Sequence, residues 1–591
     1  MRFVLAIVSF VLAALAIGLG IAQKTVFARP DSVSAQVTTE QSAPITVIPG
    51  DVLNANPRSQ TVTMKGDGTV FAAYGRTSDV MAWVGDASYN ELGVDAETGQ
   101  VTSTFTAGES TVPNASGSDL WLLDYSNENE LAITINVPED ISLLIMSDGT
   151  LPAPDSVGIV WPVDNSTPWA IPLVVGGGGF LLLGLALLFW AVTHMRNARG
   201  PRRRSQKMPK LPRRPRYKPS RVRPKAIEAP KRGRRATKTS LVAVLPLTLV
   251  SALVLGGCSI DGVAGTNAVS APATEASADP AAVEDETETP AVTEEQAKRI
   301  VARVSAIVTQ ADEDADKELA ATRLAGPALE LRLANYKMRK ADKSVKALAQ
   351  IPAGPVKLTL PQQRDTWPRT FFAAILDEDP TVPSVALVLV QETPRDQYVV
   401  HYAITMEPGA VIPPVAQASI GTSRLGVDSP LLTVTPGDVA AAYGDILLTD
   451  EKSDYFALFD AEGDSLRADV GLAAKTARKK KIPSTAKLSF ASEAGVGQPV
   501  ALTTNDGGAL VAVSLNEVET IKVVEAGAAV NAPKQVKALL GKSMSTKGLN
   551  AVYSDQLLFY VPPVTSPDEK IVLLGYSQGI VSASEYKKKK K

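Results

Sequence analysis

Three uncharged apolar runs dominate the hydropathy pattern and divide the chain into segments. The runs over residues 3–22 and 169–193 are each long enough to cross a hydrocarbon core of about 30 Å as a helix. The run over residues 241–255 is short for a span and has the length of the apolar part of an export signal. The pattern therefore predicts transmembrane helices over residues 1–22 and 169–193, and either a third span or an export signal over residues 241–258.

The first apolar run has two interpretations. It could be a signal peptide, but the small-residue cleavage pattern that ends such peptides does not follow it. Instead, Gln23-Lys24-Thr25 comes directly after the run. We therefore favour an uncleaved anchor, followed by a first soluble region over residues 23–168.

Residues 23–168 consist of short apolar-polar alternations separated by Gly, Asn, Asp, Ser and Pro clusters. This spacing predicts a small all-β, sandwich-like domain. The segment Gly66-Asp67-Gly68 predicts a hairpin turn between strands over residues 61–64 and 69–72. Further strands are predicted over residues 101–106, 120–124, 131–137 and 141–146.

The C-terminal half begins with a spacer and continues as two similar α+β parts. Residues 259–292 are rich in Ala, Thr, Glu, Pro and Ser without periodicity, which predicts a disordered linker. A capping box at Thr293 and Gln296 then opens an amphipathic helix. Helices followed by strands recur over residues 293–425 and 430–586, an order typical of α+β domains with an antiparallel sheet. The predicted strands cover residues 356–360, 370–376, 385–391 and 398–406, and then residues 486–490, 500–504, 510–515, 557–561 and 571–576.

Local sequence matches suggest that these two parts arose by duplication. Leu331-Arg332, Ile351-Pro352 and residues 357–360 match Leu466-Arg467, Ile482-Pro483 and residues 487–490. Helices followed by a curved antiparallel sheet resemble the NTF2-like or cystatin-like fold. Tandem copies of such a fold imply a scaffold for binding and packing.

The distribution of charge predicts the membrane topology. The whole chain carries a net charge of -2, but residues 196–238 alone carry +18 and the remainder carries -20. Basic loops stay in the cytoplasm, so the Pro/Arg-rich loop over residues 194–240 is predicted to be cytoplasmic and both soluble regions extracytoplasmic. Attraction to anionic membrane lipid explains why this loop is so rich in Lys and Arg. Nucleic-acid binding is not expected, because Tyr217 is the only aromatic residue interleaved with the basic ones.

The only cysteine of the chain, Cys258, ends the third apolar run in the sequence Leu255-Gly256-Gly257-Cys258. This motif, after a basic segment and a short apolar run, resembles the lipobox of bacterial lipoproteins. The resemblance implies cleavage before Cys258 and attachment of lipid to its side chain. The alternative is an uncut chain in which Cys258 lies in a third membrane span.

The sequence predicts no catalytic, cofactor or metal site. One cysteine and two histidines, His194 and His401, cannot form a Cys/His zinc site, and we expect His401 to be structural. Asp312, Asp314 and Asp316 begin like an EF-hand loop, but Lys317 and Arg323 stand where its Gly and Glu belong. We therefore expect a solvated helix surface or linker there.

Two other patterns have a structural and a functional interpretation. Residues 176–179 are four glycines within an apolar span, which favours close helix packing over phosphate binding. Trp121, Tyr125 and Trp161 are expected in the core or at its rim, and the alternative is an aromatic platform for sugar.

Two basic segments on the predicted exterior side could bind an anionic partner. Arg478-Lys479-Lys480-Lys481 and the terminal run Lys587–Lys591 stand out in an otherwise acidic region. Either segment could contact anionic lipid or an envelope polymer. The alternative for both is a solvated surface.

The layout as a whole resembles uncharacterised membrane-anchored envelope proteins of Gram-positive actinobacteria. The likeness is carried by residues 118–122 (SDLWL), residues 147–150 (SDGT) with Pro152 and Pro154, and the lipobox. The sequence thus predicts a multi-domain membrane protein with an N-terminal all-β ectodomain, transmembrane helices, a C-terminal α+β ectodomain and a polylysine tail over residues 587–591. We expect a non-enzymatic binding or scaffold protein that faces the cell envelope, with membrane lipid and an anionic wall polymer or envelope protein as partners. The alternatives are an accessory factor or enzyme of lipid-linked sugar metabolism, and a lipoprotein-type carrier or chaperone with an apolar cavity.

Overall fold

The computed structural model describes most of the chain outside its basic loop and spacer. The described residues are 2–27, 30–39, 41–56, 58–95, 98, 100–163, 167–198, 289–376 and 382–587. Cys258, the apolar run that precedes it, most of the predicted loop and spacer, and Lys588–Lys591 lie outside these ranges. The chain divides into two compact units, one of residues 1–17 with 175–285 and one of residues 18–174 with 286–591.

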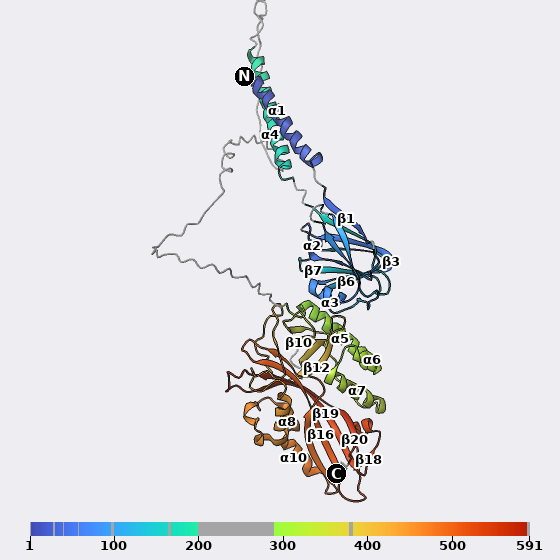
Figure 1. Ribbon diagram of the computed structural model, residues 1–591. Coiled ribbons are helices and arrows are strands. Elements are labelled where there is room, and N and C mark those ends of the chain that lie inside the picture. The colour runs from blue at the N-terminus through green and yellow to red at the C-terminus, as the bar shows by residue number, and fades with distance from the viewer. Residues whose placement is uncertain are drawn as a thin grey trace, which may run out of the picture. The chain divides into compact units, whose positions relative to one another are not determined.

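Among the described residues, two helices are long and apolar enough to cross a membrane, namely α1 (Arg2–Thr25) and α4 (Ala170–Ala198) (Figure 1). Both continue past the apolar runs that predicted them. In the first unit, Gly177 of α4 lies against Ala13 and Ile17 of α1, where an added Cβ would come within 3.1 Å of the Ala13 carbonyl oxygen. Gly177 therefore permits close helix packing, as the sequence predicted for the glycine run.

The N-terminal soluble region, which we call the β module (residues 30–163), is built from eight strands and two short helices (Figure 1). The strands are β1 (Ser32–Thr38), β2 (Ile45–Ile48), β3 (Gln60–Arg76), β4 (Tyr89–Val94), β5 (Val101–Thr106), β6 (Leu123–Ile135), β7 (Ile141–Met146) and β8 (Ser156–Pro162), and the helices are α2 (Gly50–Leu53) and α3 (Thr77–Val84). The strands form one sheet in the order β1-β8-β3-β7-β2-β4-β5, with β6 also paired to β3. The expected β-rich domain is therefore present, and the long strand β3 connects its parts.

Two strand predictions in the β module were wrong. Residues 61–64 and 69–72 do not form a hairpin, because both belong to β3. Gly68, at φ 81°, takes part in an irregularity of the β3–β6 pairing, where its N–H donates to Asn129 Oδ1 (3.1 Å). A glycine with positive φ suits a bulge as well as a turn. Residues 120–124 are also not one strand, because Leu120 and Trp121 lie in a buried turn before β6.

The C-terminal soluble region, which we call the C-terminal module (residues 289–587), begins each of its two halves with helices and continues with strands, with one more helix among the later strands (Figure 1). The first half comprises α5 (Glu294–Asp314), α6 (Lys317–Ala321), α7 (Gly326–Ala341), β9 (Val356–Pro361), β10 (Arg369–Ile375), β11 (Val385–Gln391), β12 (Val399–Met406) and β13 (Arg424–Leu425). The second half comprises α8 (Val439–Thr449), the 3₁₀ turns Asp450–Lys452 and Phe456–Leu458, α9 (Ser465–Val470), α10 (Leu472–Lys481), β14 (Ala486–Ala494), β15 (Val500–Thr503), β16 (Ala509–Val523), β17 (Val530–Asn531), α11 (Lys534–Leu540), β18 (Met544–Ser545), β19 (Gly548–Val561) and β20 (Val572–Glu585). The predicted order of helices before strands is met in the first half, whereas in the second half α11, which was not predicted, lies between β17 and β18.

The two halves share one ten-stranded sheet in the order β13-β15-β16-β19-β20-β12-β11-β10-β9, with β14 also paired to β16. Strand β13 of the first half pairs with β15 of the second half, and β12 pairs with β20 through Thr405–Tyr576 and Met406–Gly575. Beyond these pairs, the N–H groups of Ala403 and Thr405 donate to the side chains of Gln556 (2.9 Å) and Ser577 (3.1 Å). We call the junction of β12 with β20 the seam.

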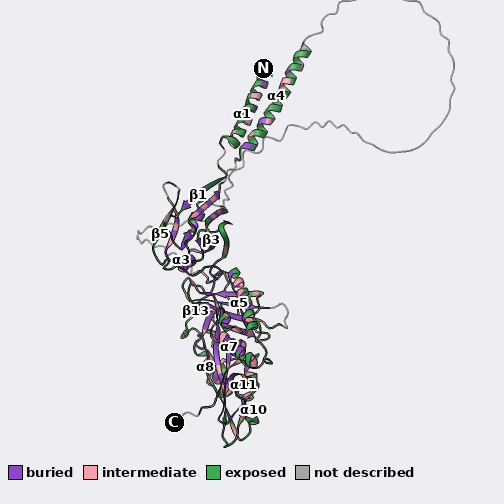
Figure 2. Ribbon diagram, turned by 90° about the vertical axis from the view of Figure 1, so that its right-hand side faces the viewer, coloured by how far each residue is buried: buried purple, intermediate pink, exposed green. Residues whose placement is uncertain are grey.

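Each half has its own buried core, and two further apolar clusters contain buried residues of both halves (Figure 2). In the first half, Ile300, Val304 and Val308 of α5 pack against Phe371 and Leu387 of the sheet. The predicted capping box is present, since Thr293 Oγ1 accepts from the Gln296 N–H (3.2 Å) and Gln296 Oε1 accepts from the Thr293 N–H (3.0 Å).

The aspartates of the EF-hand-like stretch have structural roles that differ from the predicted solvated surface. Asp312 is buried, forms an ion pair with Arg332 and accepts a hydrogen bond from the Tyr336 hydroxyl (2.6 Å). Asp316 caps α6 by accepting from the Leu319 N–H (2.9 Å). Only Asp314 is exposed, so the expectation holds for that residue alone.

Candidate functional site

Lysines gather at one end of the C-terminal module. The strand register places the start of β14, the end of β16, the start of β19 and the end of β20 together, through the pairs Ala486–Val523, Lys522–Gly548 and Leu549–Glu585. Helix α10 ends five residues before β14. The exposed lysines of these segments, which we call the lysine end, are Lys479, Lys480, Lys481, Lys487, Lys522, Lys547 and Lys587.

Two of these lysines stand directly opposite each other, since Lys487 of β14 pairs with Lys522 of β16. Two like charges that face each other in a cross-strand pair repel and destabilise the sheet. Within the part of the chain that the structure describes, none of the lysines in the lysine end forms an ion pair. By contrast, the nearby Lys542 pairs with Glu585 (2.8 Å). The lysine end therefore offers positive charge that the described protein does not neutralise.

A row of hydroxyl and amide groups follows the lysine pair on the same face of the sheet. The register aligns Ser489, Thr520, Asn550 and Ser584 across β14, β16, β19 and β20. Strands lie about 4.8 Å apart, so four adjacent strands form a row of about 15 Å. We call this row, together with Lys487 and Lys522, the polar strip. None of its residues is buried.

On the opposite face of the same strands, the charged side chains form ion pairs with one another. Lys475 of α10 is buried and paired with Glu517, and Arg478 is paired with Glu519. Arg478 and Lys479 also lie over the Phe490 ring, at 5.0 and 5.5 Å from its centroid. The basic run 478–481 is therefore used in part for packing, and Arg478 is not a free surface charge.

A buried carboxyl lies beside this network. Burial raises the pKa of Asp555 to about 8, and the neighbouring Glu517 carboxylate acts in the same direction. A hydrogen bond with the Gln578 side chain and the positive charge of Lys475 both lower the pKa of Asp555. Asp555 therefore holds a proton near neutral pH.

Other predicted residues are structural where the structure describes them. Trp121 and Trp161 are buried, and their Nε1–H groups donate to the carbonyls of Ala115 (2.8 Å) and Leu53 (2.9 Å). These two side chains therefore cannot form an exposed sugar platform. His401 lies half-buried in β12, and burial lowers its pKa, which keeps it neutral. Cys258, the candidate lipid-attachment residue, lies outside the described residues.

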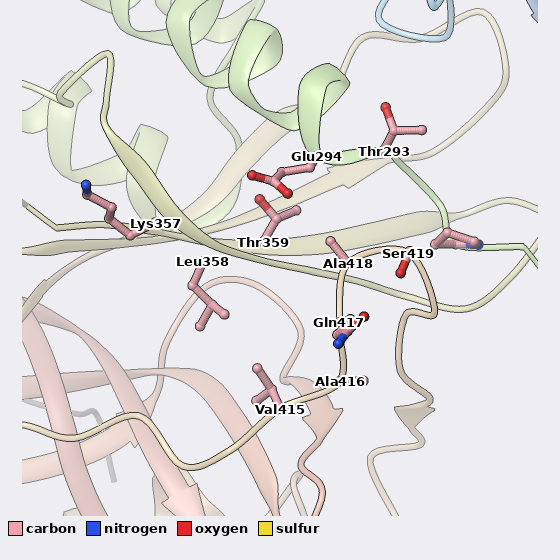
Figure 3. A pocket seen from close by; sticks show the side chains of 11 residues that line it. Thr293, Glu294, Lys357, Leu358, Thr359, Val415, Ala416, Gln417, Ala418 and Ser419 are labelled. Atoms are coloured by element: carbon pink, nitrogen blue, oxygen red, sulfur yellow. The ribbon is translucent and has the colours of Figure 1, made fainter.

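The described residues contain no group of three or more His, Cys, Asp or Glu side chains that could hold a metal ion. An open cavity of about 670 Å³ lies between the start of α5, strand β9 and residues 415–419 (Figure 3). Its lining includes one carboxylate, Glu294, which pairs with Lys298 (2.8 Å). This cavity therefore lacks the paired carboxylates of an acid–base site.

The polar strip was missed by the sequence analysis, which singled out only residues 478–481 and 587–591. The apolar runs predicted β16, β19 and β20 over residues 510–515, 557–561 and 571–576, but these strands continue into polar sequence. Thr520, Lys522, Asn550 and Ser584 all lie in the continuations. The charge pairing of Lys487 with Lys522 could be found only once the register was known.

The comparison with known proteins concerns the same module. Residues 288–585 match a family described as "Domain of unknown function (DUF8094)". No curated protein and no solved structure matches the chain. Since the match covers just over half of the sequence, the chain belongs to the DUF8094 family.

Proposed function

We propose that this chain is a non-enzymatic, membrane-anchored scaffold that faces the cell envelope and binds an anionic wall polymer through the polar strip. The observation that supports this most is the unneutralised pair Lys487–Lys522 next to a row of hydroxyl and amide groups. The lysines would attract phosphate or carboxylate groups, and the row would hydrogen-bond to a chain that lies across the strands.

The remaining parts of the proposal concern the membrane. Helices α1 and α4 would anchor the protein, with residues 194–240 cytoplasmic and both modules extracytoplasmic. The +18 charge of residues 196–238 supports this orientation. Cys258 would carry lipid if the chain is processed at its lipobox, as in the actinobacterial envelope proteins that the sequence resembles. Two NTF2-like or cystatin-like halves would then serve as the rigid support of the strip.

A polymer suits the strip better than a lipid surface does, because the strip is a row on a sheet face. An anionic membrane would contact the lysines but would leave the hydroxyl and amide row without partners. Each lysine contact with an anionic surface contributes about 1 kcal/mol. Removal of two such contacts should therefore weaken binding by about 2 kcal/mol, or roughly thirtyfold.

The test is binding of poly(glycerol phosphate) to the full chain in neutral detergent micelles, at several salt concentrations. We expect Lys487→Gln with Lys522→Gln to lower the affinity about thirtyfold and to reduce its salt dependence. Lys298→Gln, at an exposed lysine of α5 that pairs with Glu294 and Glu295, is the matched control and should have little effect.

Three outcomes would contradict the proposal. The first is equal affinity of the double variant and the wild type. The second is equal binding of neutral dextran. The third is binding to vesicles that contain phosphatidylglycerol without binding to the polymer, which would indicate a lipid-binding surface instead.

A further inference from the structure

The β module and the C-terminal module belong to the same compact unit and contact each other through buried charges. Asp79 of α3 is 1% exposed and forms an ion pair with Arg369 of β10, whose side chain is 0% exposed (2.7 Å). The guanidinium of Arg369 also lies 3.8 Å from the centroid of the Trp367 ring. Arg76 of the β module completes the group by pairing with Asp79 at 2.9 Å.

A second aspartate of the β module is held in the same manner. Asp119 is buried and forms an ion pair with Arg323 (2.5 Å) and another with Arg303 of α5 (3.3 Å). The main-chain N–H of Tyr398 donates to the same carboxylate at 3.0 Å. Each aspartate thus faces an arginine of the other module. Asp119 is hydrogen-bonded to Arg323, whereas Asp79 and Arg369 attract each other by charge without a hydrogen bond.

Hydrogen bonds to main-chain carbonyls extend the contact. Arg299 donates to the Trp121 carbonyl (2.7 Å), and Gln296 donates to that of Leu120 (2.8 Å). Arg395 donates to the carbonyls of Trp83 (2.9 Å) and Val84 (2.8 Å). In the opposite direction, Arg76 donates to the Pro290 carbonyl (2.7 Å). Domains joined only by a tether move independently unless their interface is large and apolar. This interface is mainly polar, so its hydrogen bonds and the packing of Trp367 against an apolar cluster of the β module would have to hold the modules together.

The sequence between the modules makes this interface important. Residues 164–288, which hold α4 and the lipobox at Cys258, separate the two modules along the chain. A cut before Cys258 would leave the modules on different polypeptides. We infer that the β module is the specific binding partner of the C-terminal module, and that the two stay together as a non-covalent complex when the chain between them is cut. This inference does not rest on polymer binding.

The experiment uses the full chain with a protease recognition sequence inserted within residues 262–280. Cleavage there separates the modules and also leaves Cys258, with any lipid, on the N-terminal piece. The cut protein in neutral detergent is then passed through a size-exclusion column at low and moderate salt. We expect the two pieces to elute together.

Substitutions in the interface should reduce this co-elution. Asp79→Asn with Asp119→Asn should weaken the complex at least tenfold, as measured from the fraction of the C-terminal piece that remains bound on dilution. Glu130→Gln, which removes an exposed pair with Lys65 on the β module, is the matched control. Circular dichroism of the separated pieces establishes that the double variant remains folded.

Separate elution of the wild-type pieces at low salt would overturn the inference. Co-elution of the double variant with unchanged affinity would also overturn it, because the pieces would then associate elsewhere. Failure of the proposed polymer binding would change neither result.

Discussion

The buried carboxylate of Asp312 should be one of the largest single-residue contributors to the stability of the C-terminal module. It is 9% exposed and lies against Arg332, which is 5% exposed. It also accepts the Tyr336 hydroxyl, and its main-chain oxygen accepts a hydrogen bond from Arg339 (2.6 Å). Asp312→Ala leaves the Arg332 charge buried without its partner, which typically costs about 3–5 kcal/mol.

The neighbouring aspartates provide graded controls. Asp316→Ala removes the cap of α6 and should cost about 1 kcal/mol. Asp314→Ala changes an exposed side chain and should cost less than about 0.5 kcal/mol. Since about 1 kcal/mol shifts the melting temperature of a domain of 150–250 residues by about 2–4 °C, we expect Asp312→Ala to lower it by about 10 °C.

The assay is thermal unfolding of the full chain in detergent, followed by circular dichroism with and without calcium. Equal melting temperatures for Asp312→Ala and Asp314→Ala would refute the reasoning from burial. A calcium-dependent rise in the melting temperature that disappears in all three variants would refute the structural interpretation of these aspartates.

Two further predictions concern pH and backbone conformation. Because burial raises the pKa of Asp555 to about 8, its protonated form stabilises the fold fully below pH 4, and this stability is lost as the pH rises toward 8. The urea midpoint of the wild type should therefore fall between pH 5 and pH 8 more steeply than that of Asp555→Asn, and parallel curves would contradict this. Gly548→Ala should be more destabilising than Gly68→Ala in thermal unfolding, by about 1 kcal/mol or more. Both glycines have positive φ, but an added Cβ at Gly548 meets the Ile521 carbonyl, whereas the space around Gly68 is open. Equal losses of stability in the two variants would contradict this prediction, because they would show that the crowding at Gly548 is relieved.

Periodic and capped segments were the most predictable parts of the fold. The predicted strands over residues 101–106 and 385–391 coincide with β5 and β11, and the capping box opens α5 at Thr293. The structure of these segments can be predicted locally, because the apolar spacing or the capping residues that determine it lie within a few residues of one another. The Gly66–Gly68 segment was ambiguous at that range, since the glycines that permit a turn also permit a bulge.

The candidate site and the interface between the modules depend on contacts that no local pattern encodes. Asp79 and Arg369 are almost three hundred residues apart, and neither differs from an ordinary surface charge in the sequence. Asp119 lay within the SDLWL segment used for the actinobacterial resemblance, yet its pairing with Arg323 could not be inferred from that segment. Lys487 and Lys522 likewise become a pair only through the register of β14 and β16.

The seam and two apolar clusters beside it join the two halves of the C-terminal module mechanically. The chain enters this module through its first half, whereas the proposed polymer contact lies at the far end of its second half. Tension between a membrane anchor and a wall polymer would therefore cross from β12 to β20 through two residue pairs and the side chains of Gln556 and Ser577. It would also cross the apolar clusters that both halves share, in which Tyr402 packs with residues such as Leu510 and Leu558. Helix α7, which contacts both β12 and β20, is the element placed to share this load. The two halves would thus carry tension as one body, so that a pull on the polymer would reach the first half without separating the halves.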